Sequence, residues 1–419
     1  MISIGILIVI LTFFAIIKRY ETRLVLFVAG VAMALVAGKP LVAIDAFAKA
    51  MVNEGLVTTI CTVMGFSYVM KQTGCDSHLV QLLTNLLKKG KFILIPGAVI
   101  MTWILNIALP STAGCAAAVG AVLIPTLIGS GVHPAMAAAC VMTGTFGSTM
   151  SPGLSHNPFV AKLANVDVMT VIAGHTSAVL VALVVAAPML TFISYLRKEG
   201  PSAERASKIT IKEQNFKVNF AKALVPIIPL VLLVLGSNLV ALIPVVTVPQ
   251  AMIMGAILGF VVTLGNAQEI SKSFFKGMGD SYGEIMGIII AAAVFTHGMD
   301  VIGITGSLIE KMKQSQDIAR YAASFGPYFL AILSGSGDAA ALAFNGAVTP
   351  HAAQFGFKIT DMGSLATISG ALGRTMSPVA GGAIVCATIA GVNPIEIAKR
   401  TAPGMILALL AILIVFSAK

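Results

Sequence analysis

The sequence predicts an all-α, polytopic membrane protein, and three observations support this fold class. Hydrophobic residues make up 57% of the 419 residues and charged residues only 11%, whereas soluble domains carry about 25% charged residues. The mean hydropathy is +0.95. Apolar stretches recur along the whole chain, and many contain glycine or proline. A chain with so little polar surface needs lipid as its solvent.

The apolar stretches fall into two groups. Those of the first half lie at about 2–17, 24–46, 55–70, 92–109, 113–130, 134–150 and 168–196. Those of the second half lie at about 223–244, 250–265, 283–296, 325–333, 339–350, 363–376, 379–392 and 402–418. The first stretch has no cationic region before it and no small-residue cleavage site after it, so we expect a retained membrane helix.

A basic segment separates the two groups. Residues 197–222 contain Arg197, Lys198, Arg205, Lys208, Lys212, Lys217 and Lys222. Short basic loops favour the cytoplasmic side, so we expect this linker in the cytoplasm and both termini outside. Such loops also account for the net charge of +10, and we expect no nucleic-acid partner.

The two halves repeat each other. The run Gly144-Thr-Phe-Gly-Ser-Thr-Met-Ser-Pro152 matches Gly370-Ala-Leu-Gly-Arg-Thr-Met-Ser-Pro378 at six of nine positions, at an offset of 226 (370 minus 144). Upstream, Leu109-Pro-Ser-Thr-Ala-Gly114 corresponds to Leu333-Ser-Gly-Ser-Gly-Asp338 at nearly the same offset. Threading the chain between its basic loops gives residues 1–196 and 223–419 opposite orientations. Inverted repeats of this kind are typical of secondary transporters.

Each repeat is predicted to hold one re-entrant hairpin. Pro110 to Gly114 interrupts the apolar region 92–130, and Ser334 to Asp338 interrupts the region 325–355. Proline ends a helix, and broken backbone within a membrane must be buried in protein or line a water-filled cavity. The alternative is an ordinary turn between two full-length helices. The matching of the two regions favours the hairpins.

Each repeat is also predicted to hold one broken helix, at about 134–165 and 363–392. The interruptions are Gly147-Ser-Thr-Met-Ser-Pro152 and Gly373-Arg-Thr-Met-Ser-Pro378. A break offers hydroxyls, free carbonyls for a cation and a helix N-terminus for a carboxylate. The alternative is a proline kink whose serines bond back to the helix. Two matched breaks beside two matched hairpins favour a binding site.

Two charges distinguish the second repeat from the first. Arg374 takes the place of Ser148, and its guanidinium fits a carboxylate in two-point contact. Alternatively, Arg374 forms an internal ion pair with Asp338, which could itself carry a proton or bind a cation. His156 and Lys162 either line the pathway or reach its mouth. We expect His175, His297 and Asp300 to be solvated near the membrane interfaces.

The sequence lacks the signatures of the main enzyme classes. It has no Gly-x-x-x-x-Gly-Lys loop for ATP and no His-Glu-x-x-His pair for zinc. The five cysteines are scattered without metal-binding spacing and are predicted to be small packing residues. We therefore expect no enzyme, no resident metal and no cofactor other than a transported cation.

The motifs resemble the anaerobic C4-dicarboxylate carrier family of the DcuC type, within the ion transporter superfamily. The similar segments are Gly373-Arg-Thr-Met-Ser-Pro-Val379, Ser334 to Asp338, Ser111 to Gly114, and the Lys399-Arg-Thr401 start of the last helix. The resemblance implies a homodimer in the bacterial inner membrane, with a scaffold and an elevator-type transport domain that holds both hairpins and both broken helices. The sequence departs from the family pattern at two places. One is Phe146–Pro152, and the other is Asp338, a position at which asparagine is familiar in the family.

These observations predict cation-coupled transport of C4-dicarboxylates such as succinate, fumarate and malate, with H⁺ or Na⁺ as the coupling ion. The alternatives are a carrier for another organic anion, an ion exchanger, or a channel or membrane subunit without transport. We expect the two tips and two breaks to converge near mid-membrane. The predicted substrate-binding residues are Ser111, Thr112, Ser148, Thr149, Ser336, Arg374, Thr375 and Ser377. The coupling-ion candidates are Gly114, Gly147, Asp338 and Gly373.

Overall fold

A computed structural model describes residues 1–18, 20–87, 94–207, 216–237, 240–307 and 316–418. These residues form helices and connecting segments without a β-strand. Four helical stretches among them are long and apolar enough to cross a membrane: Thr112–Gly129, Val168–Leu196, Ala267–Ile302 and Pro394–Ser417. The predicted all-α fold is confirmed. Residues 92–93 of the first hairpin and 208–215 of the basic linker lie outside the described residues.

The chain divides into two compact units. Unit 1 comprises residues 1–60, 155–175 and 280–374, and unit 2 comprises residues 61–154, 176–279 and 375–419. The helices of unit 1 are α1 (Ile2–Ile17), α2 (Thr22–Val36), α3 (Pro40–Met51), α9 (His156–Ala164), η3 (Tyr282–Met286), α16 (Gly287–Ile302), α18 (Gln316–Ser334), α19 (Gly337–Ala347) and η4 (Thr349–Phe355).

The helices of unit 2 are α5 (Cys75–Leu87), α6 (Leu94–Ala108), α7 (Thr112–Gly129), α8 (Pro134–Gly144), η2 (Thr145–Met150), α11 (Ala203–Ser207), α12 (Phe220–Leu224), α13 (Ile228–Leu235), α14 (Val248–Thr263), α21 (Gly381–Ala390) and α22 (Pro394–Ser417). Four helices pass from one unit into the other: α4 (Glu54–Thr73), α10 (Val168–Leu196), α15 (Ala267–Ser281) and α20 (Ile359–Thr375).

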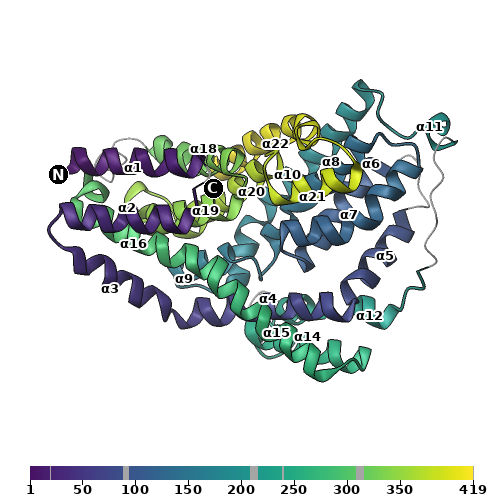
Figure 1. Cartoon of the computed structure of the whole chain (residues 1–419), viewed down its shortest axis with the longest axis horizontal. Coiled ribbons are helices and arrows are strands. Elements are labelled where there is room, and N and C mark those ends of the chain that lie inside the picture. Colours follow the sequence, from purple (N-terminus) through teal and green to yellow (C-terminus); the bar gives the residue numbers. More distant parts are fainter. Residues whose placement is uncertain (19, 88–93, 208–215, 238–239, 308–315, 419) are drawn as a thin grey trace. The chain divides into compact units, whose positions relative to one another are not determined.

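Unit 1 is built on the packing of α2 against α16, with α1 beside them (Figure 1). Glycines allow the two helices to cross closely, since a Cβ on Gly298 would lie 2.9 Å from the Gly30 Cα. Small residues at a crossing are typical of membrane helices because they let backbones approach. Apolar side chains from α2, α16, α18 and α19 complete this core.

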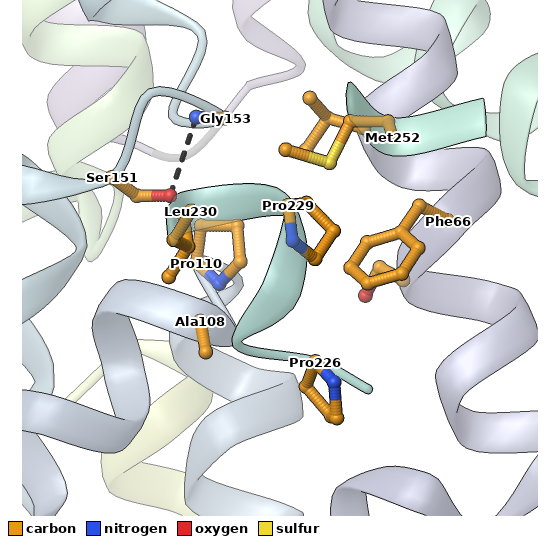
Figure 2. Close-up of a pocket in the computed structure, with 11 residues that line it drawn as sticks. Phe66, Ala108, Pro110, Ser151, Gly153, Pro226, Pro229, Leu230 and Met252 are labelled. Carbon is orange, nitrogen blue, oxygen red and sulfur yellow. Dashed lines mark hydrogen bonds between the residues drawn. The ribbon is translucent and has the colours of Figure 1, made fainter. Parts of the chain in front are cut away.

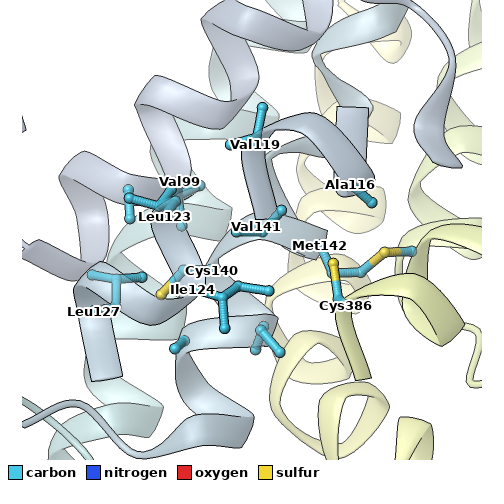
Figure 3. Packing of buried hydrophobic residues seen from close by; sticks show 14 of the residues in the cluster. Val99, Ala116, Val119, Leu123, Ile124, Leu127, Cys140, Val141, Met142 and Cys386 are labelled. Atoms are coloured by element: carbon cyan, nitrogen blue, oxygen red, sulfur yellow. The ribbon is translucent and has the colours of Figure 1, made fainter. Parts of the chain in front are cut away.

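Unit 2 has its core where α7 packs against α8 and α21 (Figure 3). The side chains in this core include Val99, Ala116, Val119, Leu123, Ile124, Leu127, Cys140, Val141, Met142 and Cys386. Cys140 and Cys386 pack as small apolar residues, and all five cysteines are buried and outside any disulfide. This agrees with the packing role predicted for them.

Two apolar stretches are broken where the sequence suggested continuity. The stretch 24–46 is divided between α2 and α3 because Gly38 adopts a φ of +70° and Pro40 opens the next helix. The stretch 223–244 is divided between α12 and α13, with Pro229 at the start of α13. Proline lacks the amide hydrogen that would bond to the preceding turn, so it is favoured at a helix start, and glycine tolerates a left-handed conformation.

Each compact unit draws on both halves of the sequence. Unit 1 joins α18, α19 and most of α20 to α9 of the first half, and unit 2 joins α6, α7 and α8 to α21 of the second half. Helix starts recur at the expected spacing: α7 and α19 begin at an offset of 225 (337 minus 112), and α10 and α22 begin at an offset of 226 (394 minus 168). The opposite membrane orientation and the division at 1–196 and 223–419 stay predictions.

The grouping of the hairpins differs from the one that the family resemblance implied. Hairpin α6–α7 belongs to unit 2 and hairpin α18–α19 to unit 1, whereas the resemblance placed both in one transport domain. The scaffold and transport domains therefore stay a prediction. The second hairpin also begins earlier than expected, at Gln316 rather than about 325.

A buried ion pair fastens the start of the basic linker to α22. The Arg400 Nε donates to the Glu199 Oε2 at 2.7 Å, and the Arg400 Nη2 forms a second contact with Oε1. Arg400 also donates to Glu396 at 2.9 Å. Arg400 is 3% exposed and Glu199 is 8% exposed. A two-point Arg–carboxylate contact is the arrangement that best compensates for burying both charges.

Candidate functional site

The first hairpin tip is formed in unit 2 by residues 109–111. Ser111 is the N-cap of α7, and its Oγ accepts a hydrogen bond from the Gly114 amide at 3.2 Å. The Thr112 hydroxyl is buried and has no hydrogen-bond partner in the described part of the chain. A Cβ on Gly382 would lie 2.7 Å from the Thr112 Cγ2, so the N-termini of α7 and α21 are in contact. Ser111 and Gly114 are exposed.

The first helix break is held by an asparagine of α6. The Ser148 amide donates to the Asn106 Oδ1 at 2.7 Å, and the Asn106 Nδ2 donates to the Leu109 carbonyl at 2.8 Å. The Ser148 hydroxyl donates to the Thr145 carbonyl at 3.3 Å, and the Thr149 hydroxyl donates to the Phe146 carbonyl at 2.8 Å. Both hydroxyl residues are fully buried, so they bond back to the helix as the kink interpretation described.

The second hairpin tip is formed in unit 1 by residues 334–336. Ser336 is the N-cap of α19, and its Oγ accepts a hydrogen bond from the Ala339 amide at 3.1 Å. The same cap occurs at Ser111 in the first repeat, at an offset of 225 (336 minus 111). Asp338 lies within the first turn of α19 rather than in the break. An acidic side chain there is stabilised by the helix dipole.

The two breaks share one packing device. A Cβ on Gly147 would lie 3.0 Å from the Trp103 Cα and overlap the Trp103 carbonyl oxygen. A Cβ on Gly373 would lie 3.0 Å from the Tyr328 Cα and overlap the Tyr328 carbonyl oxygen. Each glycine thus lets a broken helix lie against the first helix of the hairpin in its own half. The coupling-ion candidates Gly147 and Gly373 are therefore also packing residues.

Arg374 lies at the end of α20 and is 5% exposed. Its Nη1 lies 3.5 Å from the Asp338 Oδ1, and the His156 Nε2 lies 3.6 Å from the same oxygen. The structure thus contains the internal pair that sequence reasoning weighed against direct substrate contact. The two interpretations are compatible because the Asp338 side chain is 44% exposed.

The last two predicted substrate residues follow in unit 2. Thr375 and Ser377 are each 1% exposed. The Ser377 Oγ accepts a hydrogen bond from the Val379 amide at 3.3 Å, which stabilises the turn before α21. The predicted residues are therefore divided: Ser336, Asp338, Gly373 and Arg374 belong to unit 1, and the other eight belong to unit 2.

A small pocket lies in unit 2 next to the first hairpin tip (Figure 2). Pro110 of the tip and Ser151 of the first break contribute to its wall, and the Ser151 Oγ accepts a hydrogen bond from the Gly153 amide at 3.2 Å. The remaining lining residues are Val63, Phe66, Ser67, Ala108, Gly153, Pro226, Pro229, Leu230 and Met252. The wall carries no charge, so this pocket alone could not neutralise a carboxylate.

Sequence reasoning missed the buried asparagines that hold the hairpins. Asn345 of α19 is fully buried; its amide donates to the Thr367 hydroxyl at 3.2 Å and its oxygen accepts from Thr349 at 2.8 Å. A lone amide within an apolar run was the available signal, at Asn106 and at Asn345. The repeat could not reveal them because their equivalents at an offset of 226 are Ile332 and Val119.

Three histidines and a lysine also have definite positions. His175 is fully buried and its Nδ1 lies 2.9 Å from the Ser364 Oγ, so the expectation that it is solvated is wrong. His297 is exposed, as expected. His156 is 2% exposed and its side chain lies beside Asp338, whereas Lys162 is exposed at the end of α9.

Apolar helices long enough to cross a membrane, two interrupted helices and a buried arginine beside one interruption are typical of a multi-pass membrane transporter. The family model of the C4-dicarboxylate anaerobic carriers, DcuC, matches residues 1–418. The chain therefore belongs to the DcuC family, and the resemblance noted in the sequence is confirmed.

Individual relatives agree with this family. An uncharacterized transporter of Haemophilus influenzae is 42% identical over 271 residues, which cover 62% of this chain and 97% of that protein. The anaerobic C4-dicarboxylate transporter DcuC of Escherichia coli K12 is 23% identical over 370 residues, covering 85% of this chain and 79% of that protein. The structure of the Neisseria gonorrhoeae efflux pump MtrF matches with a TM-score of 0.59 and 14% identity, covering 91% and 85% of the two chains. That likeness shows the fold alone.

Proposed function

We propose that the chain is a secondary active transporter of C4-dicarboxylates, coupled to H⁺ or Na⁺. One observation carries the proposal: in a member of a dicarboxylate carrier family, a guanidinium with a 6% exposed side chain lies at a helix break beside a carboxylate that is 44% exposed. A charge within a membrane protein is costly unless it is paired or hydrated, and such charges usually serve transport. Arg374 can neutralise one substrate carboxylate.

Helix N-termini supply further positive potential in both units. In unit 1, His156 is the first residue of α9 and its side chain lies beside Asp338 in the first turn of α19. In unit 2, the N-termini of α7 and α21 are in contact through Thr112 and Gly382. Amides at helix starts bind carboxylates, and free carbonyls at helix breaks bind cations. We assign carboxylate binding to the residues of the hairpin tips and cation binding to the glycines of the breaks.

Uptake by proteoliposomes tests this proposal. Purified protein is reconstituted, and flux of labelled succinate or fumarate is followed while pH and sodium gradients are imposed separately. We expect saturable uptake that unlabelled dicarboxylate abolishes and that one of the two gradients drives. An ionophore that collapses the driving gradient should remove accumulation but leave exchange. The absence of saturable flux under either gradient would contradict the proposal.

The same preparation separates the rival functions. A thermal-shift screen with mono-, di- and tricarboxylates should show the largest stabilisation with C4-dicarboxylates, because a ligand stabilises the state that it binds. Stabilisation by another organic anion alone would assign the protein to a different substrate. Single-channel currents in planar bilayers would indicate a channel.

Topology and assembly follow from the same proposal. We expect a homodimer in the bacterial inner membrane, an elevator movement, external termini and a cytoplasmic linker 197–222. All five native cysteines are buried, so a cysteine introduced at the exposed Lys217 should react above a low background. Labelling of this site from the cytoplasmic side, and not from the periplasm, is the expected result. The reverse pattern would contradict the topology.

A further inference from the structure

Asp338 lies between two buried side chains of unit 1. Its Oδ1 is 3.5 Å from the Arg374 Nη1 and 3.6 Å from the His156 Nε2. The side chains of Arg374 and His156 are 6% and 2% exposed, whereas that of Asp338 is 44% exposed. The carboxylate is therefore the accessible member of the group. The buried side chains of Arg374 and His156 lie behind it, and together they are called the seat.

The contacts to Asp338 are long. Hydrogen bonds between a cationic nitrogen and a carboxylate usually measure about 2.7–2.9 Å, so neither contact is a tight bond. His156 also has a buried Nδ1 without a hydrogen-bond partner among the described residues. Buried polar atoms are normally satisfied. The long contacts leave the seat able to hold an anion more closely than it holds Asp338.

Glycines bring this carboxylate to the arginine. A Cβ on Gly337 would lie 2.6 Å from the Gly370 carbonyl oxygen and 3.1 Å from the Arg374 Cβ. The first turn of α19 therefore rests directly on the last turns of α20. This contact holds the two backbones together. Separation of Asp338 from Arg374 therefore needs a rotation of the Asp338 side chain and no movement of either helix.

Among the described residues, no other charged group on the elements packed against α19 forms an ion pair with Asp338. Within the described ranges, its ion-pair partner is Arg374 of α20, and the imidazole of His156 of α9 lies at a similar distance. Asp300 of α16 accepts a hydrogen bond from Thr305 at 2.6 Å, and Arg320 of α18 lies over the Phe357 ring. The other ionisable residues in the sequences of these elements are Lys162, His297, Asp317, Tyr321, Tyr328, His351 and Asp361.

We infer that Asp338 and a substrate carboxylate compete for the seat formed by Arg374 and His156, and that the substrate enters when Asp338 takes up one proton. This inference rests on the proposed dicarboxylate transport and deepens it. Two carboxylates beside one guanidinium repel each other, and an extra charge away from water is costly. A proton on Asp338 removes that charge, so the bound substrate carboxylate faces Arg374 and a neutral carboxyl group.

The competition predicts a pH dependence that resides in Asp338. The test measures calorimetric binding of fumarate to the full-length protein at about pH 6 and pH 8, where both fumarate carboxyls are ionised. If one proton is taken up on binding, the wild-type Kd rises by up to about tenfold per pH unit. Asp338→Asn should bind more tightly than wild type at the higher pH, with little dependence on pH. His156→Gln should weaken binding at both values and keep the pH dependence.

The matched control is Asp361→Asn. It makes the same chemical change in the same unit, thirteen residues before Arg374 on α20, or roughly 20 Å along the helix. This variant should match wild type. Proton uptake on the wild-type protein gives a second readout, from titrations in buffers of different ionisation enthalpy. We expect about one proton per bound fumarate at the higher pH.

The outcomes separate the inference from the proposed function. If wild type binds no dicarboxylate at either pH, the proposed function fails and the inference fails with it. If wild type binds fumarate without proton uptake, or if Asp338→Asn keeps both the wild-type affinity and its pH dependence, only the inference is wrong.

Discussion

Replacing Gly373 by alanine should destabilise the protein through one backbone contact. The added Cβ would lie 2.9 Å from the Tyr328 carbonyl carbon and 3.0 Å from the Tyr328 Cα, and would overlap the carbonyl oxygen. A neighbouring side chain could rotate away, but a backbone carbonyl within α18 cannot. Overpacking of this kind costs about 1–3 kcal/mol. Because the Gly147 contact with Trp103 has the same geometry, Gly147→Ala should cost a similar amount.

Thermal unfolding in detergent measures this effect, with Gly174→Ala as the matched control. Gly174 is a helical, exposed glycine of α10, and its added Cβ would meet no atom within 4 Å. That substitution should be neutral or stabilise by up to about 1 kcal/mol, since alanine restricts the unfolded chain. An unfolding midpoint of Gly373→Ala equal to that of Gly174→Ala would refute the packing argument. Agreement between Gly373→Ala and Gly147→Ala would show that the two breaks are equivalent in energy.

Two further predictions concern buried polar contacts. Arg400→Ala should cost about 3–5 kcal/mol because it leaves the buried Glu199 carboxylate without its two-point partner, and removing both side chains together should cost less. A thermal midpoint unchanged in Arg400→Ala would be inconsistent with this account. Asn345→Ala should cost at least about 1–3 kcal/mol because it leaves the Thr349 hydroxyl unpaired at that contact; equal urea midpoints for the variant and wild type would contradict it.

The repeat made much of the local structure predictable from the sequence. Proline lacks a backbone donor and disfavours a helix interior, and Pro110, Pro152 and Pro378 located the hairpin tip and the two breaks. Serine before a helix start is a local signal as well. The caps formed by Ser111 and Ser336 therefore follow from the same motifs, although hydroxyls that bind substrate were the expected role.

Contacts between distant parts of the sequence could not be predicted in this way. His156 of the first half reaches Asp338 of the second, and Glu199 reaches Arg400 across 201 residues. Neither pair has a counterpart in the other half, because the repeat conserves backbone breaks and not charges. The burial of His175 was missed for the same reason. Its partner Ser364 lies 189 residues away, and hydropathy near the helix start gave no sign of it.

The exchange of segments between the units was also hidden from the sequence. Local patterns indicate where a helix breaks, but they do not show with which hairpin each piece packs. The structure places α9 in the unit of the second hairpin and α21 in the unit of the first. This exchange brings His156, a residue of the first half, next to the Asp338–Arg374 pair of the second half.

Fumarate binding to Arg374 variants tests the central claim most directly. The charge pair at issue is the one between Arg374 and a carboxylate of bound fumarate. Truncating one member of such a buried, hydrogen-bonded pair costs about 2–5 kcal/mol of binding free energy, which is at least about thirtyfold in Kd. Arg374→Ala should therefore lose measurable binding, and Arg374→Lys should retain part of it because lysine keeps the charge but not the two-point geometry. The double variant Arg374→Ala with Asp338→Asn, which leaves no unpaired carboxylate, should be folded and still fail to bind. Wild-type affinity in Arg374→Ala, or in the folded double variant, would contradict the account.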